Sequence, residues 1–237
     1  MNINTSLEVF LFFGIIFDMT KKKKITLITS ISIASSLALA LIIPFSIYGI
    51  RSAVIDNSYS YLLKENKLTD KKIDVPLVKQ DISCGYAIIE MLSDYYGNKV
   101  TEEQLSEKNN GGISTATTSG FVKEINQTIE NVNYVSKEYL KNDALLLTIN
   151  KSLLNDKPVA VEWAAKLDNE WTLHWSVVTG MDQEHVYVNN PYGYKEEISY
   201  EEFISRTTFK AFENMHIGYQ FGFAYGLFSK NTIIVAK

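Results

Sequence analysis

The sequence predicts a domain of the α+β class with an antiparallel sheet, because its hydrophobic periodicity changes once along the chain. Up to residue 154, apolar residues recur at helical spacing. From residue 158 onward, they alternate with polar residues, as expected for strands with one buried face. A helical part followed by a strand-rich part is typical of α+β proteins.

The best-defined helix begins at Cys84, the only cysteine, and is expected to end at Gly97. Its apolar face consists of Ala87, Ile88, Met91, Leu92 and Tyr95. A capping box at residues 101–104 predicts a second, short helix. Apolar periodicity predicts two further helices, over residues 119–129 and 143–154.

The second part of the chain has the pattern of several strands joined by turns. The expected strands cover residues 158–164, 171–181, 185–190 and 232–236. Pro191 and Gly193 predict a turn after the third of these strands, and residues 199–204 a capped helical turn. Neighbouring strands joined by such short connections pair in an antiparallel sheet.

An uncharged, apolar run covers residues 25–50 and follows the basic cluster Lys21 to Lys24. At 1.5 Å per residue, such a helix is long enough to cross a hydrocarbon core of about 30 Å. We therefore expect an uncleaved signal anchor, with residues 1–24 in the cytoplasm and the chain after residue 50 outside the cell membrane. Residues 51–72 are expected to be a linker, and residues 73–237 one domain.

The N-terminal part also contains a candidate signal-peptide cleavage site and a second candidate start of translation. Ala38-Leu39-Ala40 has the small residues of a signal-peptide cleavage site, and cleavage would give a secreted protein. Residues 1–18 contain an apolar run that is too short to span a membrane. We expect translation to start at Met19, directly before the basic cluster.

Composition excludes several classes of partner and cofactor. The formal charge is −4, and no basic stripe is present, so nucleic acid is not an expected partner. One cysteine and three histidines, without a C-x-x-C or H-E-x-x-H motif, make a metal site improbable, and no cofactor is expected. The sequence does not indicate an oligomeric state.

Cys84, His174 and Asn190 have the residue types and placement of a catalytic triad. A cysteine at a helix N-terminus favours the thiolate, which is the nucleophilic form. His174 lies in the middle of a strand, and Asn190 ends the next one, so the two can meet across neighbouring strands. An Asn side chain that accepts from one imidazole nitrogen leaves the other free to take the thiol proton. Asp182 is the alternative residue to orient His174.

Acyl transfer also needs a hydrogen-bond donor for the negatively charged oxygen of the intermediate. The backbone N–H of Cys84 and the side-chain amide of Gln80 are the two candidates. His185 and His216, the other two histidines, are expected to be surface residues.

Several motifs around these residues occur together. V-P-L-V-K-Q precedes the C-G that opens the helix, and that helix ends in Y-Y-G. H-W-S-V-V-T-G-M-D begins at His174, and V-Y-V-N-N-P-Y-G contains Asn190. Together they resemble the papain-like bacteriocin-processing (double-glycine leader) cysteine peptidases and their stand-alone relatives without transporter domains, over roughly residues 73–205.

The resemblance implies a papain-like fold with Cys84 as nucleophile, His174 as base, Asn190 as third triad member and Gln80 as oxyanion-hole donor. Two positions depart from the family pattern. Asn190 stands where the family usually has Asp before Pro, and Gln80 lies four residues before the cysteine instead of six. The sequence also has no G-x-x-x-x-G-K-[ST] motif.

Combined with the anchor, the resemblance predicts a membrane-anchored, extracytoplasmic cysteine peptidase. Its substrate would be an exported or surface peptide or protein. Two other functions fit the same sequence: a non-catalytic papain-like binding domain at the cell surface, and another amide hydrolase or acyl transferase that uses the same triad.

Overall fold

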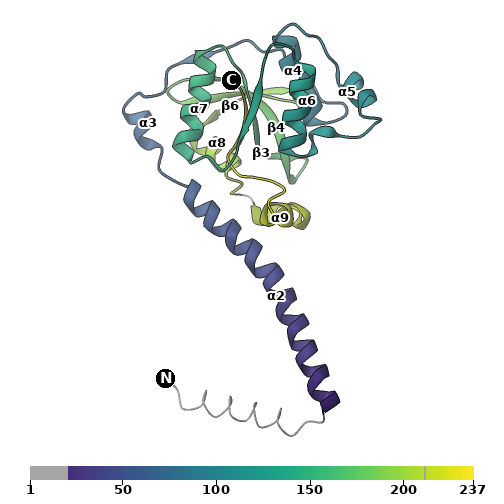
Figure 1. The fold of residues 1–237 in the computed structure, drawn as a ribbon. Coiled ribbons are helices and arrows are strands. Elements are labelled where there is room, and N and C mark those ends of the chain that lie inside the picture. Colours follow the sequence, from purple (N-terminus) through teal and green to yellow (C-terminus); the bar gives the residue numbers. More distant parts are fainter. Residues whose placement is uncertain (1–20, 211) are drawn as a thin grey trace. The chain divides into compact units, whose positions relative to one another are not determined.

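The computed structural model describes residues 21–210 and 212–237. The chain divides into two compact units between Ser46 and Ile47. The predicted α+β class is confirmed, because the second unit has helices packed on an antiparallel sheet (Figure 1). The expectations for residues 1–18, including a start at Met19, lie outside the described residues.

Helix α2 (Lys21–Ile55) contains the whole apolar run of residues 25–50. Its apolar side chains are exposed, for example Ile28 at 58% and Leu37 at 63%. Within the described part of the chain, it is the one helix whose length and composition would allow it to cross a membrane. Membrane anchors and signal sequences both have these properties.

The second unit contains a sheet of seven strands in the described chain, and all their pairings are antiparallel. The order is β2-β7-β3-β4-β5-β6, and β1 pairs with β4 beyond this path. The strands are β1 (Lys71–Lys72), β2 (Tyr134–Lys137), β3 (Val159–Leu167), β4 (Glu170–Met181), β5 (His185–Asn190), β6 (Tyr194–Ser199) and β7 (Thr232–Ala236).

Helices cover both faces of this sheet (Figure 1). Leu146 and Ile149 of one helix and Phe203 of another pack with Trp163 in the core of one face. The core of the other face includes Ile88 and further residues of two other helices, packed against Trp175 and Val177. The helices are α3 (Ser60–Lys64), α4 (Cys84–Tyr95), α5 (Glu102–Lys108), α6 (Thr118–Thr128), α7 (Asn142–Leu154), α8 (Tyr200–Thr207) and α9 (Ile217–Ala224), with short 3-10 turns at Ser114–Ala116 and Phe212–Asn214. Helices α7 and α8 thus lie on one face, and α4 and α6 on the other.

The segment expected to be a linker, residues 51–72, takes part in the core of the second unit. Ile55, Leu62 and Leu68 are each no more than 2% exposed. Strand β1 pairs with Gly180 and Met181 of β4. This unit therefore begins at Ile47, earlier than the expected boundary at residue 73, because isolated apolar residues of a polar segment pack under α7 and the sheet.

Candidate active site

Cys84 is the first residue of α4, as its position in the sequence predicts. Ser83 caps the helix, and its Oγ accepts from the backbone N–H of Tyr86 at 3.2 Å. The three preceding backbone N–H groups, those of residues 81–83, all donate to the buried carboxylate of Glu102 at 2.9 to 3.0 Å. The loop that contains Cys84 is thus fixed on both sides of this residue.

Gly85, which follows Cys84, is required by a close contact. A Cβ atom at this position would lie 2.2 Å from Oγ1 of Thr115, which is in the 3-10 turn beside α4. Any other residue would push the two segments apart. The C-G pair therefore reflects packing at the start of the helix.

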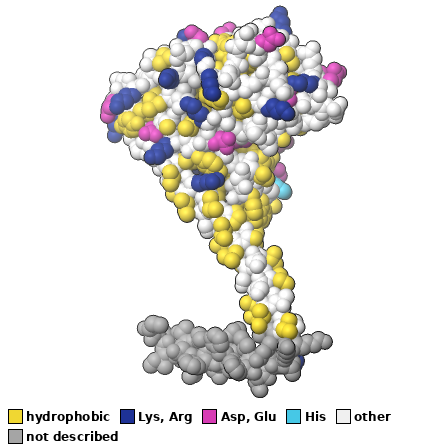
Figure 2. Space-filling model, in the orientation of Figure 1, with side chains coloured by type: hydrophobic (Ala, Val, Ile, Leu, Met, Phe, Trp, Pro, Cys, Tyr) yellow, Lys and Arg dark blue, Asp and Glu magenta, His cyan; other side chains and the backbone are white. Residues whose placement is uncertain are grey.

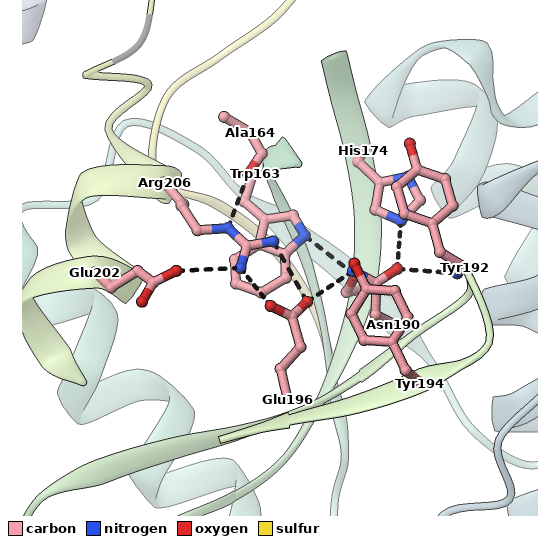
Figure 3. A network of polar contacts seen from close by, with 10 residues as sticks. Trp163, Ala164, His174, Asn190, Tyr192, Tyr194, Glu196, Glu202 and Arg206 are labelled. Atoms are coloured by element: carbon pink, nitrogen blue, oxygen red, sulfur yellow. Dashed lines mark hydrogen bonds and ion pairs between the residues drawn. The ribbon is translucent and has the colours of Figure 1, made fainter. Parts of the chain in front are cut away.

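His174 and Asn190 are in direct contact, as the strand spacing allows. Nε2 of His174 lies 2.9 Å from Oδ1 of Asn190 (Figure 3). Both side chains are buried, at 2% and 0% exposure. His174 is on β4, opposite Trp163 of β3, and Asn190 is the last residue of β5.

Glu196 and Arg206 determine which way the Asn190 amide points. Glu196 Oε1 accepts from Nδ2 of Asn190 at 2.7 Å, and Arg206 Nη1 lies 2.6 Å from Glu196 Oε2 (Figure 3). A carboxylate can only accept, so the NH2 group of Asn190 faces Glu196 and its oxygen faces His174. In the neutral imidazole the proton is therefore on Nε2, which leaves Nδ1 free to act as a base.

Tyr192, two residues after Asn190, covers the imidazole. Its ring stacks on that of His174 with centroids 4.1 Å apart and an interplanar angle of 26°. Its backbone N–H donates to Asn190 Oδ1 at 2.9 Å, and its hydroxyl lies 3.2 Å from Oγ1 of Thr172. The Asn190-Pro191-Tyr192 corner therefore holds the ring of His174 from its edge and from one side.

The thiol of Cys84 lies at the backbone of the same strand. The thiol contacts the backbone N–H of Trp175, the residue that follows His174. A negative charge on its sulfur would raise the pKa of the Tyr192 hydroxyl. Among the residues that the structure describes, no hydrogen bond joins this thiol directly to the imidazole of His174. Such contacts are often long in unliganded enzymes and shorten when substrate binds.

Burial decides the protonation states of this pair. It raises the pKa of the Cys84 thiol, and the opposing backbone N–H groups of Trp175 and Gly85 do not compensate. Burial likewise lowers the pKa of His174 to about 4, against the hydrogen bond from Asn190. Near neutral pH both groups are uncharged, so the expectation of a favoured thiolate is corrected. At Cys84, the loss of solvation raises the pKa of the thiol more than the N–H groups at the helix N-terminus lower it.

Gln80 is tied to the same corner of the molecule despite its unusual distance from Cys84 in the sequence. Its backbone N–H donates to the carbonyl of Pro191 at 2.7 Å. Its side-chain Oε1 is buried and has no hydrogen-bond partner among the described residues. The loop before Cys84 and the corner after β5 are thus joined at Gln80.

The alternative orienting residue, Asp182, lies elsewhere. Its carboxylate accepts from the hydroxyl of Tyr187 and from backbone N–H groups in the β4–β5 turn. Burial would raise its pKa, but these hydrogen bonds outweigh it and hold the pKa at about 2. His185 lies beside Asp182 and is one-third exposed, while His216 is an exposed cap of α9. None of the three contacts His174.

Comparison with known protein families decides the identity of the fold and chemistry. A family model described as the Peptidase_C39 like family matches residues 72–220, well over half of the chain. The chain belongs to this family. It is a cysteine peptidase of the C39 type, as the motifs around Cys84, His174 and Asn190 predict. No curated protein matches the chain.

Three solved structures of peptidases are similar to the chain. A C39-like peptidase from Bacillus anthracis is 16% identical, with a TM-score of 0.48 over 71% of this chain and 97% of that one. A double glycine motif protease from an AMS/PCAT transporter, in complex with the leader peptide, is 17% identical, with a TM-score of 0.48 over 72% and 96%. The peptidase domain of Streptococcus ComA, a bifunctional ABC transporter, is 18% identical, with a TM-score of 0.44 over 69% and 98%.

Four residues of this C39-like site were not found from the sequence. Glu102, Tyr192, Glu196 and Arg206 position the candidate triad through the contacts described above. Of these four, only Tyr192 lies in a motif that the sequence shows, the N-N-P-Y-G corner. Glu196 and Arg206 meet through the pairing of β6 with β5 and the packing of α8, which charge patterns do not reveal.

Glu162 is a buried carboxyl close to the nucleophile. It lies on β3 opposite Trp175, is 2% exposed, and its Oε2 has no hydrogen-bond partner in the described chain. Burial, and then the charge of Glu138, raise its pKa to about 8. The group is therefore mainly uncharged at neutral pH. Its ionised form would raise the pKa of Cys84 further.

Glu162 is expected to make the fold less stable as the pH rises. Between the ordinary pKa near 4.5 and about 8, the unfolded chain ionises this carboxyl while the folded chain does not, so the free energy of unfolding falls by up to about 5 kcal/mol. Glu162→Gln should remove this loss between pH 5 and pH 8 in urea unfolding of the full chain. The exposed Glu107→Gln should leave it unchanged. Parallel profiles for Glu162→Gln and the parent would contradict the prediction.

Proposed function

We propose that the protein is a membrane-anchored, extracytoplasmic cysteine peptidase that cleaves an exported or surface peptide with Cys84, His174 and Asn190. The buried hydrogen bond between His174 and Asn190 carries the proposal, because it fixes the imidazole tautomer that a base needs. Membership in the C39-like family supports a peptide substrate. The apolar part of α2 supports the anchor.

In the proposed mechanism, Nδ1 of His174 takes the proton from the Cys84 thiol as sulfur attacks the carbonyl carbon of the scissile bond. The imidazolium then gives this proton to the departing amine, and an acyl-enzyme forms on Cys84. Water, deprotonated by His174, releases the acid and restores the thiol. Because both groups start uncharged, proton transfer accompanies the attack and does not precede it.

Asn190 serves this mechanism by keeping His174 in one orientation through both proton transfers. The Oδ1 atom of Asn190 stabilises the imidazolium by accepting its hydrogen bond. Glu196, which accepts from the other end of the same amide, adds a negative charge behind Asn190. An Asp at this position would contribute its charge directly. Here Asn190 and Glu196 together provide the same hydrogen-bond acceptor and the same sign of charge.

Gln80 is the proposed side-chain donor for the oxyanion, beside the backbone N–H of Cys84. Support comes from its backbone bond to Pro191, which holds it at the corner that carries Asn190 and Tyr192. Donors that are fixed before the reaction stabilise the negative charge most effectively. The three hydrogen bonds from residues 81–83 to the Glu102 carboxylate fix the loop between Gln80 and Cys84.

Intact bacterial cells that express the full chain are expected to cleave peptides from a mixed library supplied in the medium, compared with cells carrying an empty vector. His174→Ala should lower the cleavage at least about 10³-fold, because His174 is the proposed base for both proton transfers. His185→Ala, a change to a histidine on the neighbouring strand, should keep it. Mass spectrometry of the library provides the readout.

Two outcomes would contradict parts of this proposal. Cleavage that appears only after the cells are lysed would place the domain on the cytoplasmic side. Equal cleavage by the parent and His174→Ala would remove His174 from the mechanism.

In the part of the chain that the structure describes, Cys84 and His174 are not hydrogen-bonded, and this observation favours a second function, a non-catalytic binding domain. In that case the library would remain uncleaved, and Cys84 would react with iodoacetamide equally fast in the parent and in His174→Ala.

A further inference from the structure

Helix α9 (Ile217–Ala224) and the turn after it expose large apolar side chains. Ile217, Phe221, Tyr225 and Leu227 are 55%, 39%, 52% and 63% exposed. The first three recur every four residues and therefore form one stripe along the helix. Hydrophobic side chains gather on this part of the body in Figure 2. Contiguous apolar surface of this kind marks a site of interaction with a protein or a membrane.

The other side of α9 is buried, so its position on the body is fixed. Phe223 is 1% exposed, and its ring centroid lies 4.6 Å from that of Phe209, which is in the loop after α8. Gly222 lies so close to the ring of Phe228 that a Cβ atom would be 2.3 Å from it. The exposed stripe is therefore presented outward by a packed helix and cannot turn inward.

The C-terminal end of α2, from Ile47 on, belongs to this unit and contacts the same residues as α9. Tyr48, the second residue of this unit, packs in the cluster of Phe209, Met215 and Phe223, with its ring centroid 6.1 Å from that of Phe223. Lys230 lies 4.7 Å from the ring of Tyr48. Tyrosines and cations next to an apolar span are typical of the boundary between lipid and water.

The charge of the segment fits the same boundary. No Asp, Glu, Lys or Arg occurs between Glu213 and Lys230, which leaves α9 and the following turn without a charge. Arg51, whose guanidinium lies 5.0 Å from the ring of Tyr139, is an exposed cation next to this segment, whereas Lys230 is only 9% exposed. An exposed cation beside an uncharged apolar stripe matches a lipid surface that carries anionic headgroups.

We propose that the exposed stripe of α9 lies in the lipid–water interface of the bilayer that α2 spans, so that the peptidase body rests on the membrane. This proposal rests on the anchor in the proposed function. An eight-residue helix alone would bind lipid weakly, but α2 holds it at the surface, and tethering turns its insertion into an intramolecular step. The occupant of the stripe is thus lipid, and contact with a second protein is the competing outcome.

The experiment uses single fluorescent labels on the full chain in vesicles of phosphatidylcholine and phosphatidylglycerol. Cys84 is replaced by alanine, and one cysteine carrying the dye NBD is introduced by Leu227→Cys, Leu37→Cys or Glu107→Cys. These sites report on the turn that follows the α9 stripe, the middle of the apolar run and the exposed surface of α5. Spin-labelled lipids with the quencher near the headgroup or deep in the chains measure the depth of each dye.

The label at Leu227 should be quenched at least about twofold more strongly by the shallow than by the deep quencher. The label at Leu37 should show the reverse, and the label at Glu107 should respond to neither. Adding Ile217→Asp to the Leu227 protein should weaken its quenching. This acidic residue is compatible with the first helical position, so the helix should remain folded.

Each failure has a separate signature. If Leu227 behaves like Glu107 while Leu37 is quenched deeply, the anchor is present and the proposal for α9 is overturned. If Leu37 is not quenched either, the anchor fails and the proposal fails with it. If the fluorescence emission of the NBD dye at position 227 is blue-shifted but neither spin-labelled lipid quenches it, the dye contacts protein. This result also overturns the proposal.

Discussion

Cys84→Ala is expected to abolish peptide cleavage and to leave the fold intact. The thiol is the only nucleophile of its kind in the chain, and it lies at the start of α4 beside the strand that carries His174. Loss of the nucleophile from a triad lowers kcat by about 10⁶-fold in a well-studied hydrolase, and a loss of at least about 10⁴-fold is expected here. Cleavage of the peptide library by purified full chain in vesicles measures it.

The change removes a single sulfur atom at the start of α4, so the free energy of unfolding should change by less than about 1 kcal/mol. A suitable control is Ser93→Ala, a change of one buried atom in the same helix away from its N-terminus. It should retain activity. Cleavage that persists in Cys84→Ala at more than about 1% of the parent rate would reject Cys84 as the nucleophile.

Arg206→Met is expected to lower both stability and activity. Arg206 is 7% exposed, and it contacts Glu196, the carbonyl of Ala164 and the ring face of Trp163. Its removal leaves Glu196 charged without its partner, which typically costs about 3 to 5 kcal/mol. Activity should fall as well, because Glu196 orients Asn190 and Asn190 orients His174. Urea unfolding and peptide cleavage are the two measurements.

A double variant separates the two effects. Arg206→Met combined with Glu196→Leu removes both charges, and apolar replacement of a buried ion pair is often neutral for stability. We expect stability to return while activity stays low, because the carboxylate that accepts from the NH2 group of Asn190 at 2.7 Å is then missing. As a control, Glu202→Ala should change stability by less than about 1 kcal/mol, since its contact with Arg206 is 3.7 Å long and half exposed. Full recovery of activity in the double variant would show that Glu196 and Arg206 are only structural.

The periodicity of the sequence predicted those elements that have one apolar and one polar face. The segment 185–190 was predicted with the bounds of β5, and 232–236 with those of β7. The capping box at Thr101 is present in full. In each case burial of one face leaves a regular pattern in the sequence.

The elements that were missed have no such pattern. Strand β6 is an edge strand with only Ile198 buried, so its residues do not alternate. Strand β2 is four residues long. Helix α9 contains two glycines and is apolar on both sides, because one side packs on the body and the other is exposed. The helical period is therefore hidden.

For the site, the sequence predicted the side chains that perform chemistry but not those that hold them. Cys84, His174 and Asn190 occur in recognisable motifs, and the contact between the last two is present. Whether these residues and Gln80 act catalytically is still a prediction. Glu102 and Arg206 act through contacts between distant segments, and burial of Cys84 and His174 sets their protonation. Both depend on tertiary packing, which local sequence does not reveal.

Strand β7 has a consequence for the synthesis of the protein. It is the last strand along the sequence, yet it lies inside the sheet between β2 and β3. The sheet is therefore incomplete until residues 232–236 have left the ribosome, long after α2 has emerged. If the domain is exported as proposed, a sheet that closes only at its last strand would leave the chain without its complete fold during synthesis, the condition under which a polypeptide can pass through a narrow export channel.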